Sequence, residues 1–198
     1  MGIRGPYGNG WPSLAGHHPA QLGGHFNKNL LIVVGGLGLI PLRTLLLDKD
    51  KYLPLKTKIQ IFYGAKTPEE FLFKNDFDKW REQGIDLKLT IDKQCPGWDG
   101  CVGVVTKLFD EYPIVEDAQT FLCGPPIMYK FVLEKIKEKN AGLAPEDAIK
   151  DEDIYVSLER RMHCGIGVCQ HCAVGSFYTC KDGPVFRYSE IKDIPGAI

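Results

Sequence analysis

Four cysteines close to the end of the chain have the spacing of an iron–sulfur site. They follow one another in the pattern C-x4-C-x2-C-x7-C. The first two intervals match a known arrangement of thiolate ligands around a [2Fe–2S] cluster. Glycines inside the first interval let the loop bend closely around a compact inorganic core. The predicted metal ligands are Cys164, Cys169, Cys172 and Cys180.

Structural zinc is the main alternative for these four cysteines. Zinc ribbons commonly use two separate C-x2-C pairs, whereas this tail contains one such pair. His163 and His171 stand beside the cysteines, and a Rieske-type centre would bind two histidines and two cysteines. Because four cysteines already complete a ligand set, we expect both histidines near the site or at the surface.

A glycine-rich turn after an apolar run is a second candidate site. The run 29–34 is continuously apolar after its first residue, as expected of a strand that is buried on both faces. Such a turn presents backbone N–H groups and the start of a helix to a pyrophosphate. The glycines do not form the G-x-G-x-x-G fingerprint, so an ordinary strand-to-helix turn is the alternative. The turn contains Gly35, Gly36, Gly38 and, at its end, Pro41.

A cysteine at the end of a later strand is the candidate catalytic residue. Cys123 is followed by Gly124 and Pro125, at the strand end where open α/β sheets bind ligands. A thiol is small and polarizable, which suits contact with a nicotinamide ring, and an ordinary buried cysteine is the alternative. The second expected strand ends at Gly64 without the acidic residue that would bind the ribose of NAD. Lys66 could there face a 2′-phosphate or the solvent, so the choice between NAD and NADP stays open.

Strands and helices alternate along most of the chain. The pattern predicts an α/β fold with a five-stranded parallel nucleotide-binding sheet, helices on both faces, and a small C-terminal cysteine-rich subdomain. Helices are expected at 42–48, from Thr67 onward, at 102–112 and at 125–140, with Thr67 as an N-cap. The expected strands are 29–34, 57–64, 86–91, 118–124 and 153–159.

The composition of the sequence and its pattern of expected strands and helices divide the chain into three parts. Residues 1–28 are a loop-like leader, 29–157 the nucleotide-binding domain, and 158–198 the cluster subdomain. The chain of 198 residues has a net charge of −1, which does not indicate a nucleic-acid partner. No apolar run approaches the length of a membrane span, and no signal-peptide core is present, so we expect a cytoplasmic protein without membrane insertion.

Together these segments resemble the ferredoxin-NADP reductase superfamily. The segments that carry the resemblance are 4–8 (RGPYG), 35–41 (GGLGLIP), 63–65 (YGA) and 123–128 (CGPPIM), in this order. With its cysteine tail, the chain resembles the electron-transfer subunits of dihydroorotate dehydrogenase and the gamma (diaphorase) subunits of nickel–iron hydrogenases and sulfhydrogenases. Residues 157–165 and 181–186 look most like the hydrogenase type.

The resemblance implies a role for each motif. The glycine turn would hold the pyrophosphate of NAD(P), the segment from Cys123 to Pro125 would lie beside the nicotinamide, and the four tail cysteines would bind [2Fe–2S]. Pro41 and Gly64 belong to the same cofactor-binding motifs. The flavin side of the site would include Arg4, Gly5, Pro6 and Tyr7.

The resemblance also implies FAD, held in the family by an N-terminal β-barrel. Residues 1–28 are too short for a barrel and are expected to be a remnant or linker, so FAD could be bound by this chain or by another. The predicted function is that of an electron-transfer subunit between NAD(P)H, FAD, the [2Fe–2S] cluster and a catalytic partner such as a hydrogenase. The alternatives are a non-catalytic iron–sulfur or regulatory subunit, and a dihydroorotate dehydrogenase electron-transfer subunit.

Overall fold

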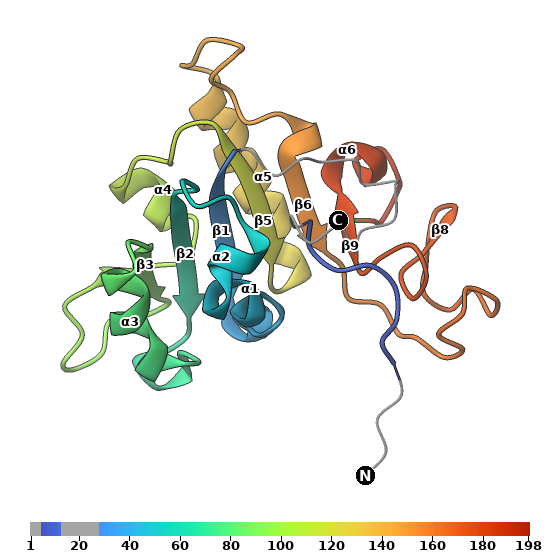
Figure 1. Cartoon of the computed structure of the whole chain (residues 1–198), viewed down its shortest axis with the longest axis horizontal. Helices are drawn as coiled ribbons and strands as arrows, with labels where there is room; N and C mark the ends of the chain where they lie inside the picture. The colour runs from blue at the N-terminus through green and yellow to red at the C-terminus, as the bar shows by residue number, and fades with distance from the viewer. Residues whose placement is uncertain (1–4, 13–27) are drawn as a thin grey trace.

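The computed structural model of the chain describes residues 5–12 and 28–198, and the predicted flavin residue Arg4 lies outside these ranges. The described part is built on a seven-stranded sheet with the order β4-β3-β2-β1-β5-β6-β9 (Figure 1). All neighbouring strands are parallel except β9, which is antiparallel to β6. The strands are β1 (Asn29–Gly35), β2 (Ile59–Ala65), β3 (Asp86–Ile91), β4 (Cys101–Val102), β5 (Ala118–Cys123), β6 (Ile154–Ser157) and β9 (Val185–Arg187).

The five predicted strands are confirmed as β1, β2, β3, β5 and β6. They form because long apolar runs can be buried on both faces of a parallel sheet: the side chains from Leu30 to Val34 are completely buried. The sheet has two strands more than predicted. Both are very short, and β9 comes from the cysteine-rich tail, so that the tail continues the sheet at its edge.

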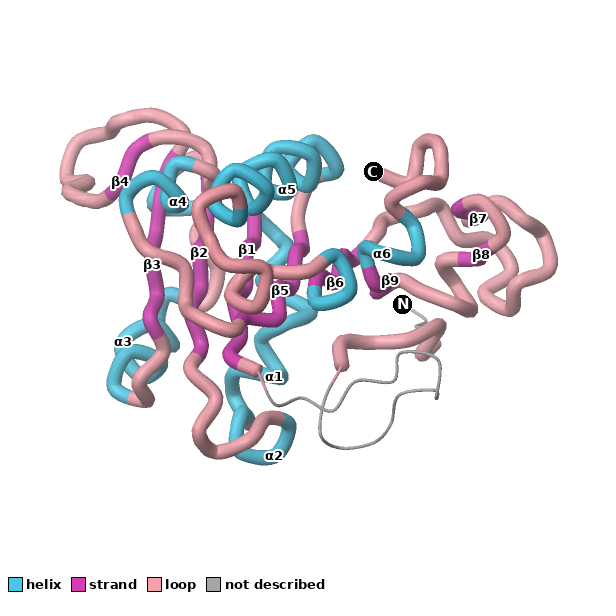
Figure 2. Tube along the Cα trace, turned by 90° about the horizontal axis from the view of Figure 1, so that it is seen from above, coloured by secondary structure: helices cyan, strands magenta, loops and turns pink. Residues whose placement is uncertain are grey.

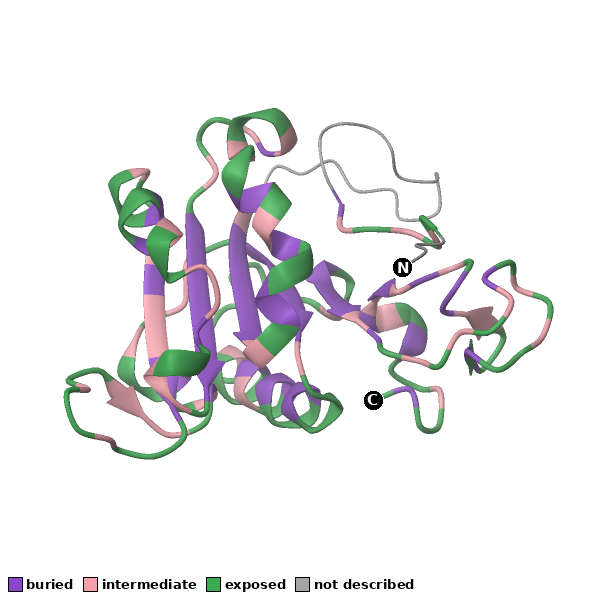
Figure 3. Ribbon diagram, turned by 90° about the horizontal axis from the view of Figure 1, so that it is seen from below, coloured by how far each residue is buried: buried purple, intermediate pink, exposed green. Residues whose placement is uncertain are grey.

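Helices cover both faces of the sheet, as Figure 2 shows. Figure 3 shows the buried strands between them, and the buried side chains fall into two apolar clusters, one on each face. The helix expected at 125–140 is confirmed as α5. The helices are α1 (Arg43–Leu47), α2 (Lys49–Tyr52), α3 (Phe77–Glu82), α4 (Lys107–Glu111), α5 (Pro126–Asn140) and α6 (Tyr188–Ile191).

The helix expected to begin at Thr67 is wrong in its first part. Two 3₁₀ turns, η3 (Pro68–Glu70) and η4 (Lys74–Asp76), stand where its first turns were expected, and the α-helix begins only at Phe77. Phe71 is extended and Phe73 is left-handed with a φ of 57°, so the helix cannot run through them. Aromatic packing explains the break, because the ring of Phe71 stacks on that of Trp98, with 5.6 Å between centroids.

Two further segments extend the fold toward the tail. The leader residues 5–12 lie beside β9 (Figure 1), where the Asn9 N–H donates to the Gly183 carbonyl. The Trp11 ring stacks on Phe121 of β5, with 4.8 Å between centroids. A separate hairpin of β7 (Ala173–Val174) and β8 (Phe177–Tyr178) lies in the tail. In the described part of the chain, no helix has the length and apolar character needed to cross a membrane.

Candidate functional site

The loop that carries the first predicted ligands turns its backbone N–H groups toward sulfur. The amides of Ile166 and Val168 lie 3.5 and 3.4 Å from the Cys164 Sγ, and the Gly167 amide lies 3.2 Å from the Cys180 Sγ. The turn needs glycine, because Gly165 and Gly167 have φ angles of 77° and 73°. The loop therefore presents a nest of N–H dipoles, which stabilises anionic sulfur.

These N–H groups change the chemistry of the first thiol. Hydrogen bonds from the amides of Ile166, Cys169 and Val168, in that order of effect, lower the pKa of Cys164 to about 6. The Cys164 thiol is therefore mostly a thiolate at neutral pH, and the thiolate is the form that binds metal. Burial, followed by the neighbouring Cys172 thiol, instead raises the pKa of Cys180.

The β7–β8 hairpin brings the last two predicted ligands together. Cys172 precedes β7 and Cys180 follows β8, so the antiparallel pairing returns the chain to its starting point. Thr179 fixes this closure, since its N–H and its Oγ1 both donate to the Cys172 carbonyl, at 3.0 and 2.9 Å. Both sulfur-bearing residues are 2% exposed.

The four thiols are arranged as two neighbouring pairs. The Cys164 thiol interacts with that of Cys169, and the Cys172 thiol with that of Cys180. The charge of Cys164 also contributes to the raised pKa of Cys180. Two thiolates for each of two irons is the ligand set of a [2Fe–2S] cluster, whereas one zinc ion needs all four about one point. Four thiols, with backbone N–H groups turned toward sulfur, fit the ligand set of a [2Fe–2S] cluster.

The two histidines of the tail lie at the surface beside this loop. The rings of His163 and His171 stack with centroids 3.9 Å apart, and both residues are exposed. The Nδ1 atom of His171 lies 3.1 Å from the Cys169 carbonyl oxygen. This placement agrees with the expectation that they lie near the site or at the surface.

The leader contacts the cluster loop through one aromatic ring. A Cβ at Gly165 would lie 2.5 Å from the Tyr7 ring, so glycine is required for this close approach. Gly5 and Pro6 are exposed. Of the three predicted flavin residues that the structure describes, Tyr7 packs against the cluster loop.

A large groove lies at the carboxyl ends of the central strands. Its volume is about 460 Å³, and its floor contains predicted residues at the ends of β1 and β2 together with Pro125. The loop before α4 and the start of α5 form its walls, where Val104, Ile127 and Phe131 are 61%, 65% and 49% exposed. The lining residues are Gly35, Gly36, Gly64, Ala65, Lys66, Glu70, Asp92, Val104, Val105, Thr106, Pro125, Ile127, Met128 and Phe131.

The remaining residues of the predicted nucleotide motifs lie outside the lining of this groove. A Cβ at Gly38 would lie 1.9 Å from the Cys123 carbonyl oxygen, so Gly38 lets the turn after β1 touch the end of β5. Pro41 is exposed within the 3₁₀ segment η2 (Gly36–Leu42). Gly124 contacts Met128 in the same way, since a Cβ there would lie 2.7 Å from the Met128 Cε. Gly38 and Gly124 therefore support the groove through close packing rather than by lining it.

Cys123 lies at the junction between the two candidate sites. It is 8% exposed, and burial raises the pKa of its thiol to about 11, so the thiol keeps its proton at neutral pH. Ser157, the last residue of β6, is its hydrogen-bond partner. The Cys123 thiol can therefore act as a neutral contact, and it is not a nucleophile at neutral pH.

Sequence reasoning missed a tyrosine at this junction. The Tyr129 hydroxyl donates to the Ser157 carbonyl and accepts from the Gly124 N–H at 3.2 Å. It thereby ties the loop after β5 to the end of β6, where the tail begins. No local signal reveals this role, because both partners are distant from the side chain until α5 packs on the sheet.

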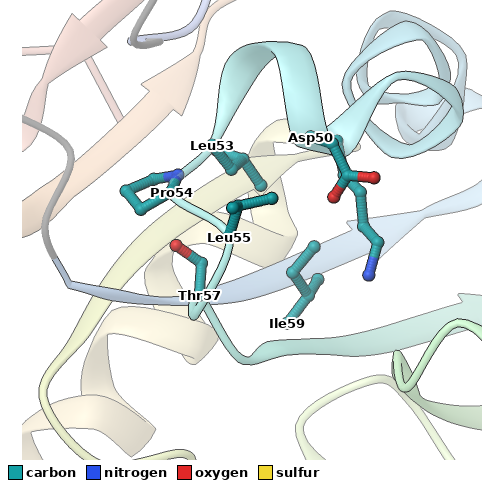
Figure 4. Close-up of a pocket in the computed structure, with 7 residues that line it drawn as sticks. Asp50, Leu53, Pro54, Leu55, Thr57 and Ile59 are labelled. Carbon is teal, nitrogen blue, oxygen red and sulfur yellow. The ribbon is translucent and has the colours of Figure 1, made fainter.

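A second hollow lies at the opposite end of the sheet from the groove. Figure 4 shows its lining, which includes Leu53, Pro54 and Ile59. Its volume is about 10 Å³, enough for little more than one water molecule. It therefore has no part in the candidate site.

The fold and the two sites define a class: a nucleotide-binding sheet joined to a cysteine-rich metal-binding tail. The comparisons with known proteins agree with it. Residues 32–134 match the family described as the oxidoreductase NAD-binding domain. Residues 159–192 match the iron–sulfur cluster binding domain of dihydroorotate dehydrogenase B.

Full-length relatives narrow the class. The chain is 39% identical to the sulfhydrogenase 2 gamma subunit of Pyrococcus furiosus, over 100% of this chain and 69% of that protein. It is 34% identical to a probable dihydroorotate dehydrogenase B (NAD(+)) electron transfer subunit of Pyrococcus abyssi, over 96% of this chain and 62% of that protein. The chain therefore belongs to the family of NAD-binding oxidoreductase subunits that includes both proteins, as the motifs predicted.

Solved structures show the same fold. The NADH-dependent reduced ferredoxin-NADP oxidoreductase, studied for flavin-based electron bifurcation, has a TM-score of 0.60 and 27% identity. The match covers 86% of this chain and 58% of that chain. The resemblance to the ferredoxin-NADP reductase superfamily is thereby confirmed.

Proposed function

We propose that this chain is a diaphorase-type electron-transfer subunit. It passes electrons between NAD(P)H, FAD and a [2Fe–2S] cluster, to or from a catalytic partner such as a hydrogenase. The observation that carries the proposal is the tail itself: four cysteines in two pairs, with amide N–H groups aimed at sulfur, on a chain whose sheet ends in a nucleotide-sized groove.

Each part of the chain has a proposed task. Residues 29–157 bind the nucleotide, residues 158–198 hold the cluster, and residues 1–28 are the link to a flavin-binding part. Cys164, Cys169, Cys172 and Cys180 are the proposed iron ligands. Gly35 and Gly36, with η2, receive the pyrophosphate, since the start of a helical segment and free N–H groups favour anions.

The redox chemistry comes from the cofactors, because a flavin accepts a hydride and releases single electrons, which an iron–sulfur cluster takes up. The chain positions and insulates them. Cys123, Gly124 and Pro125 offer a neutral, partly apolar surface for the nicotinamide. Arg4, Gly5, Pro6 and Tyr7 form the flavin side, and FAD is held by this chain or by another.

The relatives suggest the partner. The protein with 39% identity is named as a gamma subunit of a sulfhydrogenase, and by likeness this chain serves a hydrogenase-type complex in the cytoplasm. An electron-transfer role for a dihydroorotate dehydrogenase is the second candidate, favoured by the match of the tail to that protein's iron–sulfur domain. A non-catalytic iron–sulfur subunit is the third.

Reduction of an artificial dye separates these functions. Anaerobically purified protein, supplied with NADH or NADPH and FAD, is expected to reduce the dye, alone or with its native partner. Dye reduction that depends on FAD supports the electron-transfer role. Failure with every combination of nucleotide, FAD and partner would favour the non-catalytic subunit. Isolation of the native complex then decides between the hydrogenase and dihydroorotate partners.

A further inference from the structure

The groove has charged side chains at one end only. Lys66 follows β2, Glu70 lies in η3, and Asp92 directly follows β3. All three are exposed, and none of them forms a salt bridge with another residue in the described ranges. The polar end of the groove therefore carries two carboxylates and one ammonium group.

The order of the strands indicates which half of a bound dinucleotide would lie at the polar end of the groove. With the pyrophosphate at the turn after β1, one half lies toward β5 and the other toward β2 and β3. The neutral, buried Cys123 stands at the β5 side, which suits the nicotinamide. The adenosine half, including its ribose, consequently lies toward Glu70 and Asp92.

Glu70 is also held close to the glycine turn. The Tyr63 hydroxyl donates to the Gly36 carbonyl at 3.1 Å and accepts from the Leu72 N–H at 3.0 Å. The pKa of Tyr63 is raised, first by burial and also by the negative charge of Glu70. The carboxylate of Glu70 thus stands near the side of the turn that faces β2.

We propose that Glu70 and Asp92 make this groove selective for a dinucleotide with a free ribose 2′-hydroxyl, which is NAD rather than NADP. The inference rests on the proposed nucleotide-binding function and names its substrate. A carboxylate accepts a hydrogen bond from a 2′-hydroxyl, whereas it repels a 2′-phosphate. The single Lys66 leaves the lining with a net charge of −1, counting one lysine against two carboxylates.

Calorimetry with NAD⁺ and NADP⁺ tests the selectivity, because these nucleotides differ only by the 2′-phosphate. The repulsion by the two carboxylates, reduced by the attraction of Lys66, is expected to give a preference for NAD⁺ of up to about tenfold. In the double variant Glu70→Gln/Asp92→Asn, the preference is expected to fall below about threefold. Binding is measured without turnover, so the result does not depend on a bound flavin.

A matched variant controls for overall charge. Glu69→Gln/Asp99→Asn removes the same number of exposed carboxylates nearby, and neither residue lines the groove. It is expected to keep the NAD⁺ preference of the unmodified protein. Circular dichroism checks that both double variants fold.

Three outcomes would overturn the proposal. The first is NADP⁺ binding as tightly as NAD⁺ to the unmodified protein. The second is an equal change of preference in the two double variants. The third is a preference of the unmodified protein for NADP⁺ that is lost in Lys66→Gln. This result would show that Lys66 binds the 2′-phosphate. If neither nucleotide binds, the proposed nucleotide-binding function fails as well, which distinguishes that failure from a loss of selectivity alone.

Discussion

At the residue scale, the spacing of the cysteines was the most informative feature of the sequence. Metal ligands can be predicted from spacing because a short loop can bring its thiolates together in few ways. Glu70 and Asp92 have no comparable spacing pattern. The acidic residue that commonly binds the ribose was expected directly after the second strand, and neither of them stands at that position. The rule that loops after strand ends bind ligands would have singled out Asp92, which directly follows β3.

Gly38 has no Cβ, and this lets the turn after β1 pack directly against the end of β5. Gly38→Ala places a Cβ 1.9 Å from the Cys123 carbonyl oxygen, and backbone must move to relieve the clash. We expect a loss of about 1–3 kcal/mol in the free energy of unfolding. Urea denaturation measures it, with Gly142→Ala as the control, because a Cβ at Gly142 meets no atom within 4 Å. Equal stability of the two variants would contradict the packing described for η2.

The Cys123 thiol provides a prediction about pH. Burial raises its pKa from 9.0 to about 11, so the protonated form persists to higher pH in the folded protein than in the unfolded chain. Alkylation by iodoacetamide, followed by mass spectrometry, should be about a hundredfold slower than in urea at pH 8, since each pKa unit lowers the thiolate fraction tenfold. The rate in the folded protein should still rise about tenfold between pH 9 and pH 10. A rate that levels off by pH 10 would show that the pKa of the thiol is not shifted.

At the scale of elements, prediction succeeded where a segment alone determines its structure. β1 is a nearly continuous apolar run, and β2, β3, β5 and β6 combine apolar residues with a few polar ones. α5 begins with a proline pair and carries helix-forming residues. The segment 67–76 was wrong because Phe71 and Phe73 leave the helical conformation to reach aromatic partners elsewhere. β9 is only three residues long, and its pairing with β6 is a tertiary event that no local pattern indicates.

Tyr129 joins three of these elements through one hydroxyl. Tyr129→Phe leaves the Gly124 N–H and the Ser157 carbonyl without their partner in a buried place. We expect a cost of about 1–3 kcal/mol in the free energy of unfolding, together with weaker NAD⁺ binding. Denaturation and calorimetry measure the two effects. Tyr112→Phe is the matched control, because its hydroxyl makes no hydrogen bond with a described residue, and it should stay within about 0.5 kcal/mol of the unmodified protein. Equal effects of the two substitutions would refute the joining role.

At the scale of the whole molecule, the chain separates a nucleotide end from a cluster end. Figure 2 shows the β7–β8 hairpin at the opposite end of the molecule from β3 and β4. The leader links both, since Tyr7 packs against Gly165 and Trp11 against Phe121. The described leader residues therefore lie where a flavin between the two proposed sites would have to be bound.

This separation predicts that the two sites can be lost independently. Cys169→Ser removes one proposed iron ligand, so iron content should fall sharply. NAD⁺ binding should stay within about twofold, because distant sites usually couple by less than about 0.5 kcal/mol. Iron analysis and calorimetry on the same sample measure both. Loss of nucleotide binding together with iron would mean that the tail holds the fold of the whole chain.

The cluster is the centre of this account, and metal analysis tests it most directly. Protein purified without oxygen should contain about two irons and about two acid-labile sulfides per chain, and its broad visible absorption should bleach with dithionite. The spacing of Cys164, Cys169, Cys172 and Cys180, and the N–H groups that point at the sulfurs of Cys164 and Cys180, predict this result. Protein that contains one zinc ion per chain, and neither iron nor sulfide after anaerobic purification, would contradict it.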